Sequence, residues 1–117
     1  MKHDRLDQMF KGWFVGGFHP SVFSTDACEV AVKYYKAGEC EAAHYHKVAT
    51  EITLILKGKV NMFEKCWSDG DIITISPGEA TAFEAITDAV TVVVKLPGAL
   101  DDKFLVNNSI TSQILPR

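Results

Sequence analysis

The sequence predicts an all-β domain, a sandwich or barrel of short strands with one short helix near its N-terminus. Stretches rich in Val, Ile, Thr, Phe and Tyr recur along the chain, and Gly, Pro or Asp separates each from the next. Eight such stretches at close spacing are typical of a β-sandwich or β-barrel. A chain of 117 residues is also long enough for one core, so we expect residues 1–117 to form a single domain.

Local sequence signals place the individual elements. Leu6, Met9 and Phe10 repeat at helical spacing and Gly12 can end a helix, which predicts a helix over residues 4–11. The strands are expected at residues 13–18, 28–36, 40–46, 51–57, 59–65, 71–75, 80–85 and 90–96. The aromatic stretch 12–23 is expected to add a strand to the sheet of a second subunit, and the tail 100–117 to pack across the barrel end.

Composition excludes several classes of protein. Apolar residues make up 47% of the chain and charged residues 23%, and no run approaches the roughly 20 apolar residues of a membrane span. The net charge of −3 and the dispersed Lys and Arg residues give no basic surface, so no nucleic-acid partner is expected. The charged start, MKHDRLDQMF, lacks the apolar segment of a secretory signal, which predicts a cytoplasmic protein. The odd number of cysteines, three in all, predicts reduced thiols.

The stretch HYHKVATE, residues 44–51, is where we expect chemistry. Side chains alternate between the two faces of a strand, so Cys40, Ala42, His44 and His46 are expected on one face. Residues 47–50 can reverse the chain, which brings Glu51 opposite the histidines. Two imidazoles about 6.6 Å apart along a strand, with a carboxylate from the next strand, can converge on one metal ion. Such a set leaves coordination positions open for water, substrate or dioxygen.

The spacing of these residues resembles the first motif of the cupin superfamily. The chain has the required residue at every fixed position, namely Gly38, His44, His46, Glu51 and Gly58. The resemblance implies a small double-stranded β-helix, or jelly-roll barrel, with core motifs at residues 38–58 and 70–85. It also implies a homodimer, because single-domain cupins often pair through their sheets.

The second motif departs from the family pattern. The segment GDIITISPGEATAFEA, which starts at Gly70, keeps Pro77 and Gly78 of the central turn. Ser76 stands where the first proline is expected, Thr81 stands at the position of a fourth ligand, histidine, and Ala85 replaces an asparagine. The resemblance therefore implies three protein ligands rather than four.

We interpret His44, His46 and Glu51 as the ligands of one divalent transition metal. Imidazole and carboxylate suit Fe, Mn, Ni, Co or Zn, and the sequence does not distinguish among them. The pocket above the metal is expected to be walled by Cys40, Thr53, Thr81 and Phe83. Thr53 and Ile55 follow Glu51 on the inward face of the same strand. Lys33 and Lys95 lie on strands whose opposite faces are apolar. If a partner covers the outside of the barrel, the lysine side is the cavity side and a buried lysine is a candidate acid or base; we expect instead that both are ordinary exposed lysines.

Three functions remain open from the sequence. The first is a metal-dependent cupin that binds or acts on a small polar organic molecule, with dioxygen cleavage, isomerisation or decarboxylation as candidate reactions. The second is a non-catalytic module that binds a small ligand. The third is a metal-independent sugar-nucleotide isomerase or epimerase, in which His44 or His46 transfers protons. No residue beyond the metal set identifies the reaction, because the cupin fold supports many chemistries.

Overall fold

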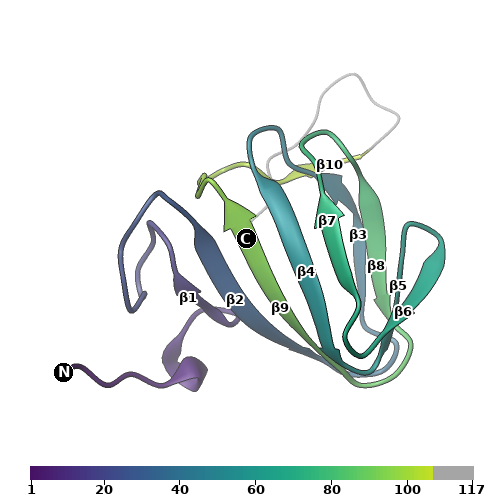
Figure 1. Cartoon of the computed structure of the whole chain (residues 1–117), viewed down its shortest axis with the longest axis horizontal. Helices are drawn as coiled ribbons and strands as arrows, with labels where there is room; N and C mark the ends of the chain where they lie inside the picture. The colour runs from purple at the N-terminus through teal and green to yellow at the C-terminus, as the bar shows by residue number, and fades with distance from the viewer. Residues whose placement is uncertain (107–117) are drawn as a thin grey trace.

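The structure is a computed structural model that describes residues 1–106. It is a β-sandwich of two five-stranded antiparallel sheets (Figure 1). One sheet has the strand order β1-β2-β9-β4-β7 and the other β10-β3-β8-β5-β6. The first sheet contains β1 (Trp13–Val15), β2 (Glu29–Tyr35), β9 (Ala89–Leu96), β4 (Thr50–Lys57) and β7 (Ile72–Ile75). The second contains β10 (Phe104–Leu105), β3 (Cys40–Tyr45), β8 (Thr81–Ala85), β5 (Lys59–Met62) and β6 (Lys65–Ser68).

The predicted all-β class is confirmed, and six of the eight expected strands appear with changes of one residue at their ends. The strand expected at residues 13–18 ends three residues early, at Val15. The strand expected at residues 59–65 ends at Met62 because Phe63 and Glu64 take positive φ angles of 52° and 56°, which turn the chain into β6. The helix expected over residues 4–11 is one 3-10 turn, Leu6–Gln8, with no buried residue to hold a longer helix against the sheet.

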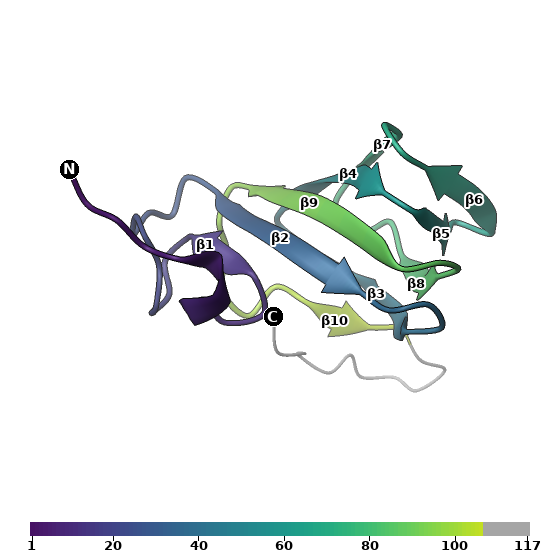
Figure 2. The same cartoon turned by 90° about the horizontal axis from the view of Figure 1, so that it is seen from below.

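Both ends of the described chain join the two sheets. The strand β1 pairs with β2 of its own chain, and the addition of the aromatic stretch to the sheet of a second subunit stays a prediction. Within the tail, Phe104 and Leu105 form β10, which pairs with Tyr45 and His44 of β3. The rest of the tail, residues 107–117, lies outside the described residues. Figure 2 shows β2 and β9 of one sheet lying over β3, β8 and β10 of the other.

The core fills the space between the two sheets. Alternate residues of facing strands supply it, among them Ile55 of β4, Val60 of β5, Ile73 of β7 and Phe83 of β8, all nearly inaccessible to solvent. A second apolar cluster forms around Trp13, which is 2% exposed and packs with Ala31, Val93 and Phe18. The site described below lies between these two clusters, so its polar groups are shielded from water on both sides.

Gly58, one of the glycines of the cupin-like motif, is required at its position for steric reasons. Its φ angle is +97°, and a Cβ atom added there would lie 2.3 Å from the carbonyl oxygen of Asp88. Only glycine fits this close approach between the β4–β5 turn and the chain before β9. No helix in residues 1–106 is both long enough and apolar enough to cross a membrane.

Candidate metal centre

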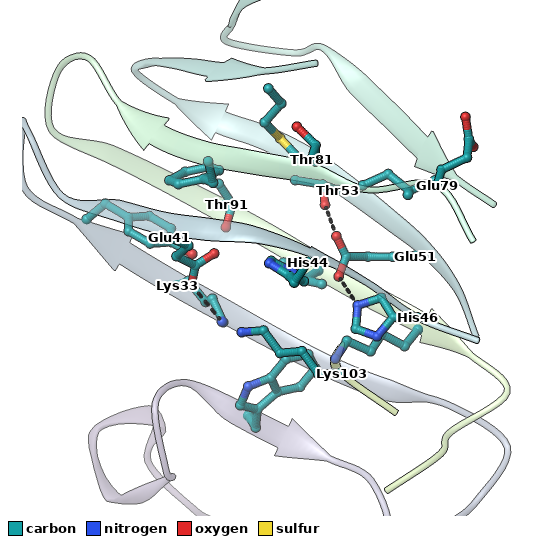
Figure 3. A pocket seen from close by; sticks show the side chains of 17 residues that line it. Lys33, Glu41, His44, His46, Glu51, Thr53, Glu79, Thr81, Thr91 and Lys103 are labelled. Atoms are coloured by element: carbon teal, nitrogen blue, oxygen red, sulfur yellow. Dashed lines mark hydrogen bonds and ion pairs between the residues drawn. The ribbon is translucent and has the colours of Figure 1, made fainter. Parts of the chain in front are cut away.

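His46 lies at the end of β3 and is 4% exposed. Its Nδ1 is hydrogen-bonded to the backbone carbonyl oxygen of Asp102. A carbonyl oxygen can only accept, so Nδ1 carries the proton of the neutral ring and Nε2 carries the lone pair. Nε2 points toward Glu51, 3.3 Å from its Oε1 (Figure 3). The backbone therefore fixes which nitrogen of His46 is presented to the pocket.

Glu51, near the start of β4, is held from two sides. Its Oε2 accepts a hydrogen bond from the Thr53 hydroxyl at 3.1 Å, and its Oε1 faces His46. Burial acts to raise the pKa of the Glu51 carboxyl, but His46, Lys95 and His44 together outweigh it and lower this pKa to about 2. Glu51 is therefore a carboxylate at neutral pH.

When the His46 imidazole is neutral, neither a proton nor a cation lies between its Nε2 and the Glu51 carboxylate. Nε2 of His46 is buried and has no hydrogen-bond partner in the described chain. A nitrogen lone pair and a carboxylate oxygen at 3.3 Å are both acceptors, and such a pair is stable only if something positive lies between or beside them. A proton on Nε2 or a bound metal ion satisfies this requirement equally well.

His44 presents the same nitrogen to the pocket. Its Nδ1 lies 3.0 Å from the carbonyl oxygen of Ala42, so Nδ1 again carries the proton and Nε2 the lone pair. Burial lowers the pKa of His44, which favours the neutral ring that a metal requires. The rings of His44 and His46 lie 5.7 Å apart between centroids, at 79° to each other. Donation of the second ring N–H to a carbonyl is the usual arrangement around metal-binding histidines.

The three side chains fit a metal chemically but do not yet surround a common point. Among residues 1–106, no group of three or more His, Cys, Asp or Glu side chains is arranged to hold an ion. Nε2 of His46 lies 3.3 Å from Oε1 of Glu51, whereas the rings of His44 and His46 are 5.7 Å apart between centroids. The metal site predicted from the sequence therefore stays a prediction, supported by the donor types and by the nitrogen that each ring presents.

Cys40 does not lie in this pocket, and a bulge in β3 is the reason. The pairing of β3 with β8 shifts between Glu41 and His44, so the alternation of faces is broken within the strand. Glu41 and His44 both line the pocket, while Cys40 is exposed and its Sγ lies 3.3 Å from the carbonyl oxygen of Gly38. The sequence analysis assumed unbroken alternation and therefore assigned Cys40 to the wrong face.

The other three expected pocket residues, Thr53, Thr81 and Phe83, do line the pocket, but Thr81 is occupied by backbone contacts. The Thr81 hydroxyl donates to the carbonyl oxygen of Ala82 at 2.7 Å and accepts from the backbone N–H of Phe63 at 2.7 Å. Its oxygen is thus engaged in closing the β5–β6 turn. Phe83 is 5% exposed and packs against the Tyr35 ring, 4.5 Å between centroids. The cavity they enclose is about 40 Å³, room for an ion and a few waters rather than a drug-sized ligand.

Two pocket residues, Lys33 and Lys95, were misplaced by the sequence analysis, and Asp102, which lies behind His46 rather than in the pocket, was missed. Lys95 is 6% exposed and Lys33 is half-buried, so the expectation that both are ordinary exposed lysines is wrong. Their position on the inner face of β2 and β9 was visible in the alternation of Val residues on the opposite face. Asp102 carried no local signal, because its contact with His46 spans 56 residues.

Comparison with solved structures gives the fold a name. A double-stranded β-helix protein from Klebsiella pneumoniae, itself uncharacterised, is 21% identical over 63% of this chain and 66% of its own, with a TM-score of 0.60. A protein from Shewanella frigidimarina containing a cupin-2 domain matches with a TM-score of 0.52 at 10% identity, over 62% of this chain and 72% of its own. The chain has the fold of the cupins.

The cupin neighbours differ in what they do. The DMSP lyase DddQ from Ruegeria pomeroyi matches 80% of this chain at 23% identity with a TM-score of 0.64, and the match spans 49% of its own length. No protein-family model and no curated protein sequence matches the chain. At these identities the likeness establishes the fold, and the function has to be argued from the site.

Proposed function

We propose that the chain is a metal-binding cupin in which His44, His46 and Glu51 hold one divalent transition metal, Fe, Mn, Ni, Co or Zn. The observation that carries this proposal is the buried Nε2 of His46, which has no hydrogen-bond partner yet faces the Glu51 carboxylate. A divalent ion resolves the contact between two acceptors without requiring either group to change its proton. Both histidines already present Nε2, as ligands would.

The ligand of this site would be a small polar organic molecule. The cavity is small, and its walls combine Phe83 and Tyr35 with the hydroxyl of Thr53. A divalent metal would act as a Lewis acid that polarises an oxygen of the bound molecule. One solved neighbour with this fold is a lyase, which supports an enzymatic role for the site. Oxidation by dioxygen, isomerisation and decarboxylation all remain candidate reactions for this chain.

The residues around the proposed metal have separate tasks. Asp102 holds the His46 ring through its backbone carbonyl, and Thr53 holds the Glu51 carboxylate through its hydroxyl. The packed rings of Tyr35 and Phe83 exclude water from one wall. A site whose ligands are oriented in advance binds its ion without having to order those side chains first.

Calorimetric titration of metal into chelator-treated protein tests the proposal. We expect one equivalent of Mn²⁺, Ni²⁺ or Zn²⁺ to bind to the parent, and Glu51→Gln to weaken that binding by about tenfold or more. The matched control is His3→Ala, since His3 is exposed and outside the site. Equal binding to the parent and the Glu51→Gln protein would contradict the assigned ligand set.

A second candidate uses the same two residues without a metal. A proton on Nε2 of His46 converts the 3.3 Å contact with Glu51 into an ion pair, and such a pair can transfer protons to a substrate. The lack of a three-way arrangement with His44 in residues 1–106 favours this alternative. It corresponds to a sugar-nucleotide isomerase or epimerase, and it predicts turnover of a 4-keto sugar nucleotide that survives exhaustive chelation. Saturable ligand binding without any turnover would instead identify a non-catalytic binding module.

We also propose that the chain, a single domain, forms a homodimer through the outer face of the β1-β2-β9-β4-β7 sheet. That face carries large apolar side chains in contact with solvent, with Tyr34, Leu56 and Ile72 exposed by 70%, 54% and 63%. An apolar face of this kind is typical of an interface between copies of one chain. Light scattering during gel filtration should give a dimer at micromolar concentration for the parent and a monomer for Leu56→Lys.

A further inference from the structure

The pocket contains a group of polar atoms that the proposed metal does not use. They lie on the inner face of β9 and on the Trp13 ring that faces it. Lys95 is 6% exposed, Thr91 is 1% exposed and Trp13 is 2% exposed, and all three line the pocket beside His46 and Glu51. Each is a hydrogen-bond donor, through an ammonium, a hydroxyl and an indole N–H respectively.

Two of these donors have no hydrogen-bond partner within the described chain, and the third makes no direct ion pair there. Thr91 Oγ1 and Trp13 Nε1 are buried without a hydrogen-bond partner. Lys95 makes no ion pair with any carboxylate of residues 1–106, and its ammonium lies 4.8 Å from the centroid of the Trp13 ring. Glu51 and Glu29 lie near enough to favour the charged form of Lys95, but neither is in direct contact with its ammonium. Buried donors without acceptors are costly, so a pocket of this kind favours a ligand that supplies acceptor oxygens.

A second lysine reinforces the positive charge at the same place. The ammonium of Lys33 lies 5.3 Å from the centroid of the same Trp13 ring, so two cations share one aromatic side chain. Lys33 has Glu41 at 3.8 Å, a long contact that leaves donors of the ammonium available. Lys103 also lines the pocket (Figure 3). Lysines gathered on one side of a pocket attract an anion to that side.

The carboxylates that line the pocket, Glu41, Glu51 and Glu79, equal its lysines in number, but each already has a partner within the described chain. Glu51 is held by His46 and Thr53, Glu41 by Lys33, and Glu79 accepts the backbone N–H of Ser76. Glu29 is the register partner of Lys95 on β2, but it does not line the pocket. Burial lowers the pKa of Lys95, Glu51 and Glu29 act to raise it, and Lys33 and Lys103 lower it further. An anion at the ammonium would favour its charged form.

We propose that the pocket takes a small organic acid, whose carboxylate binds Lys95 together with Thr91, Trp13 and Lys33. Because Lys95 and Glu51 are paired across β9 and β4, this anion subsite adjoins the three metal ligands. An oxygen next to the carboxylate, as in a 2-hydroxy or 2-oxo acid, would then face the metal. The small cavity limits the acid to a few carbon atoms. The inference deepens the proposed function and rests on it for the role of the metal.

Lactate and lactamide are the probes that test this inference. They share a carbon skeleton and a hydroxyl and differ in the charge of one group. Titration into the Ni²⁺-loaded protein, followed by amide chemical-shift changes, should give binding of lactate that is at least about tenfold tighter than binding of lactamide. Lys95→Met and Lys33→Met should each weaken lactate binding while retaining the metal. Lys59→Met, a change on the exposed face of β5, should alter neither.

The outcomes separate this inference from the proposed metal site. If the protein binds no metal but still binds lactate in a way that depends on Lys95, the anion subsite is supported and the proposed metal site is wrong. Metal binding with equal affinity for lactate and lactamide overturns the anion subsite and leaves the metal in place. Inorganic phosphate that binds more tightly than lactate and in the same Lys95-dependent way overturns the organic acid as the ligand. If Lys95→Met does not fold, Lys33→Met alone decides between these results.

Discussion

The backbone carbonyl of Asp102 accepts a hydrogen bond from Nδ1 of His46, 56 residues earlier in the chain. The carboxylate of the same aspartate accepts the backbone N–H groups of Lys47, Val48 and Ala49, at 2.9–3.2 Å. Asp102 thereby holds both the turn between β3 and β4 and the ring that precedes it. The segment after β9 therefore helps to position the side chains of the site.

Asp102→Asn is expected to lower the free energy of unfolding by about 1–3 kcal/mol. An amide offers one acceptor oxygen where the carboxylate offers two, and its NH₂ group would face backbone donors. Urea titration measures the effect, with Asp101→Asn as the matched control because Asp101 is exposed. Equal stability of the two variants would show that the turn does not depend on the Asp102 carboxylate.

Gly58→Ala is expected to destabilise the protein more than Gly38→Ala, although both glycines belong to the cupin motif. Both have positive φ angles, +97° and +91°, so each substitution should cost about 1–2 kcal/mol for the left-handed backbone. A Cβ at Gly58 also meets the Asp88 carbonyl oxygen, whereas nothing lies within 4 Å of a Cβ at Gly38. Thermal unfolding of the two variants side by side measures the difference. A smaller loss for Gly58→Ala would contradict the close approach.

Because Lys33 is buried, the difference in free energy of unfolding between Lys33→Met and the parent should depend on pH. Burial lowers the pKa of Lys33 in the folded state, and Glu41 raises it only in part. The unfolded chain therefore binds more protons between the lowered pKa and the ordinary value of 10.5, and the stability of the parent rises with pH in that window. The advantage of Met over Lys should be largest near pH 7 and shrink as the pH approaches 10.5. A constant difference across this range, measured by urea titration of metal-free protein, would show that Lys33 is solvated.

Thr81→His tests whether the position of the missing ligand faces the metal. Thr81 pairs with His44 across β8 and β3, so an imidazole there would lie beside the proposed ligands. We expect it to tighten binding of Ni²⁺ or Zn²⁺ by about tenfold, measured by competition with a chelator. Unchanged affinity would mean that residue 81 points away from the ion.

Strand periodicity predicted the site well where the strands are regular and poorly where they are not. On β4 the alternation placed Glu51, Thr53 and Ile55 on the inward face, and the structure agrees. On β3 the bulge between Glu41 and His44 breaks the alternation, and Cys40 was assigned to the wrong face. A bulge depends on pairing with a partner strand, which the residues of β3 alone do not reveal.

Long-range contacts limited the rest of the prediction. Nothing near Asp102 in the sequence indicates that it caps a turn at residues 47–49. The buried lysines were misjudged because lysine is almost always exposed, and this prior outweighed the strand alternation that placed them opposite the Val residues. In the structure both ammonium groups lie over the Trp13 ring. The motif of glycines, histidines and glutamate predicted the fold because its spacing encodes turns and facing strands together.

Elemental analysis of the untagged protein beside its His46→Ala variant tests the metal site most directly. The account predicts a near-stoichiometric transition metal in the parent and none in the variant, with His19→Ala, a change at an exposed loop histidine, retaining the metal. Parent and variant preparations that are both empty, and that bind no added Fe²⁺, Mn²⁺, Ni²⁺, Co²⁺ or Zn²⁺, would contradict it. In that case His46 is protonated on Nε2 and forms an ion pair with Glu51.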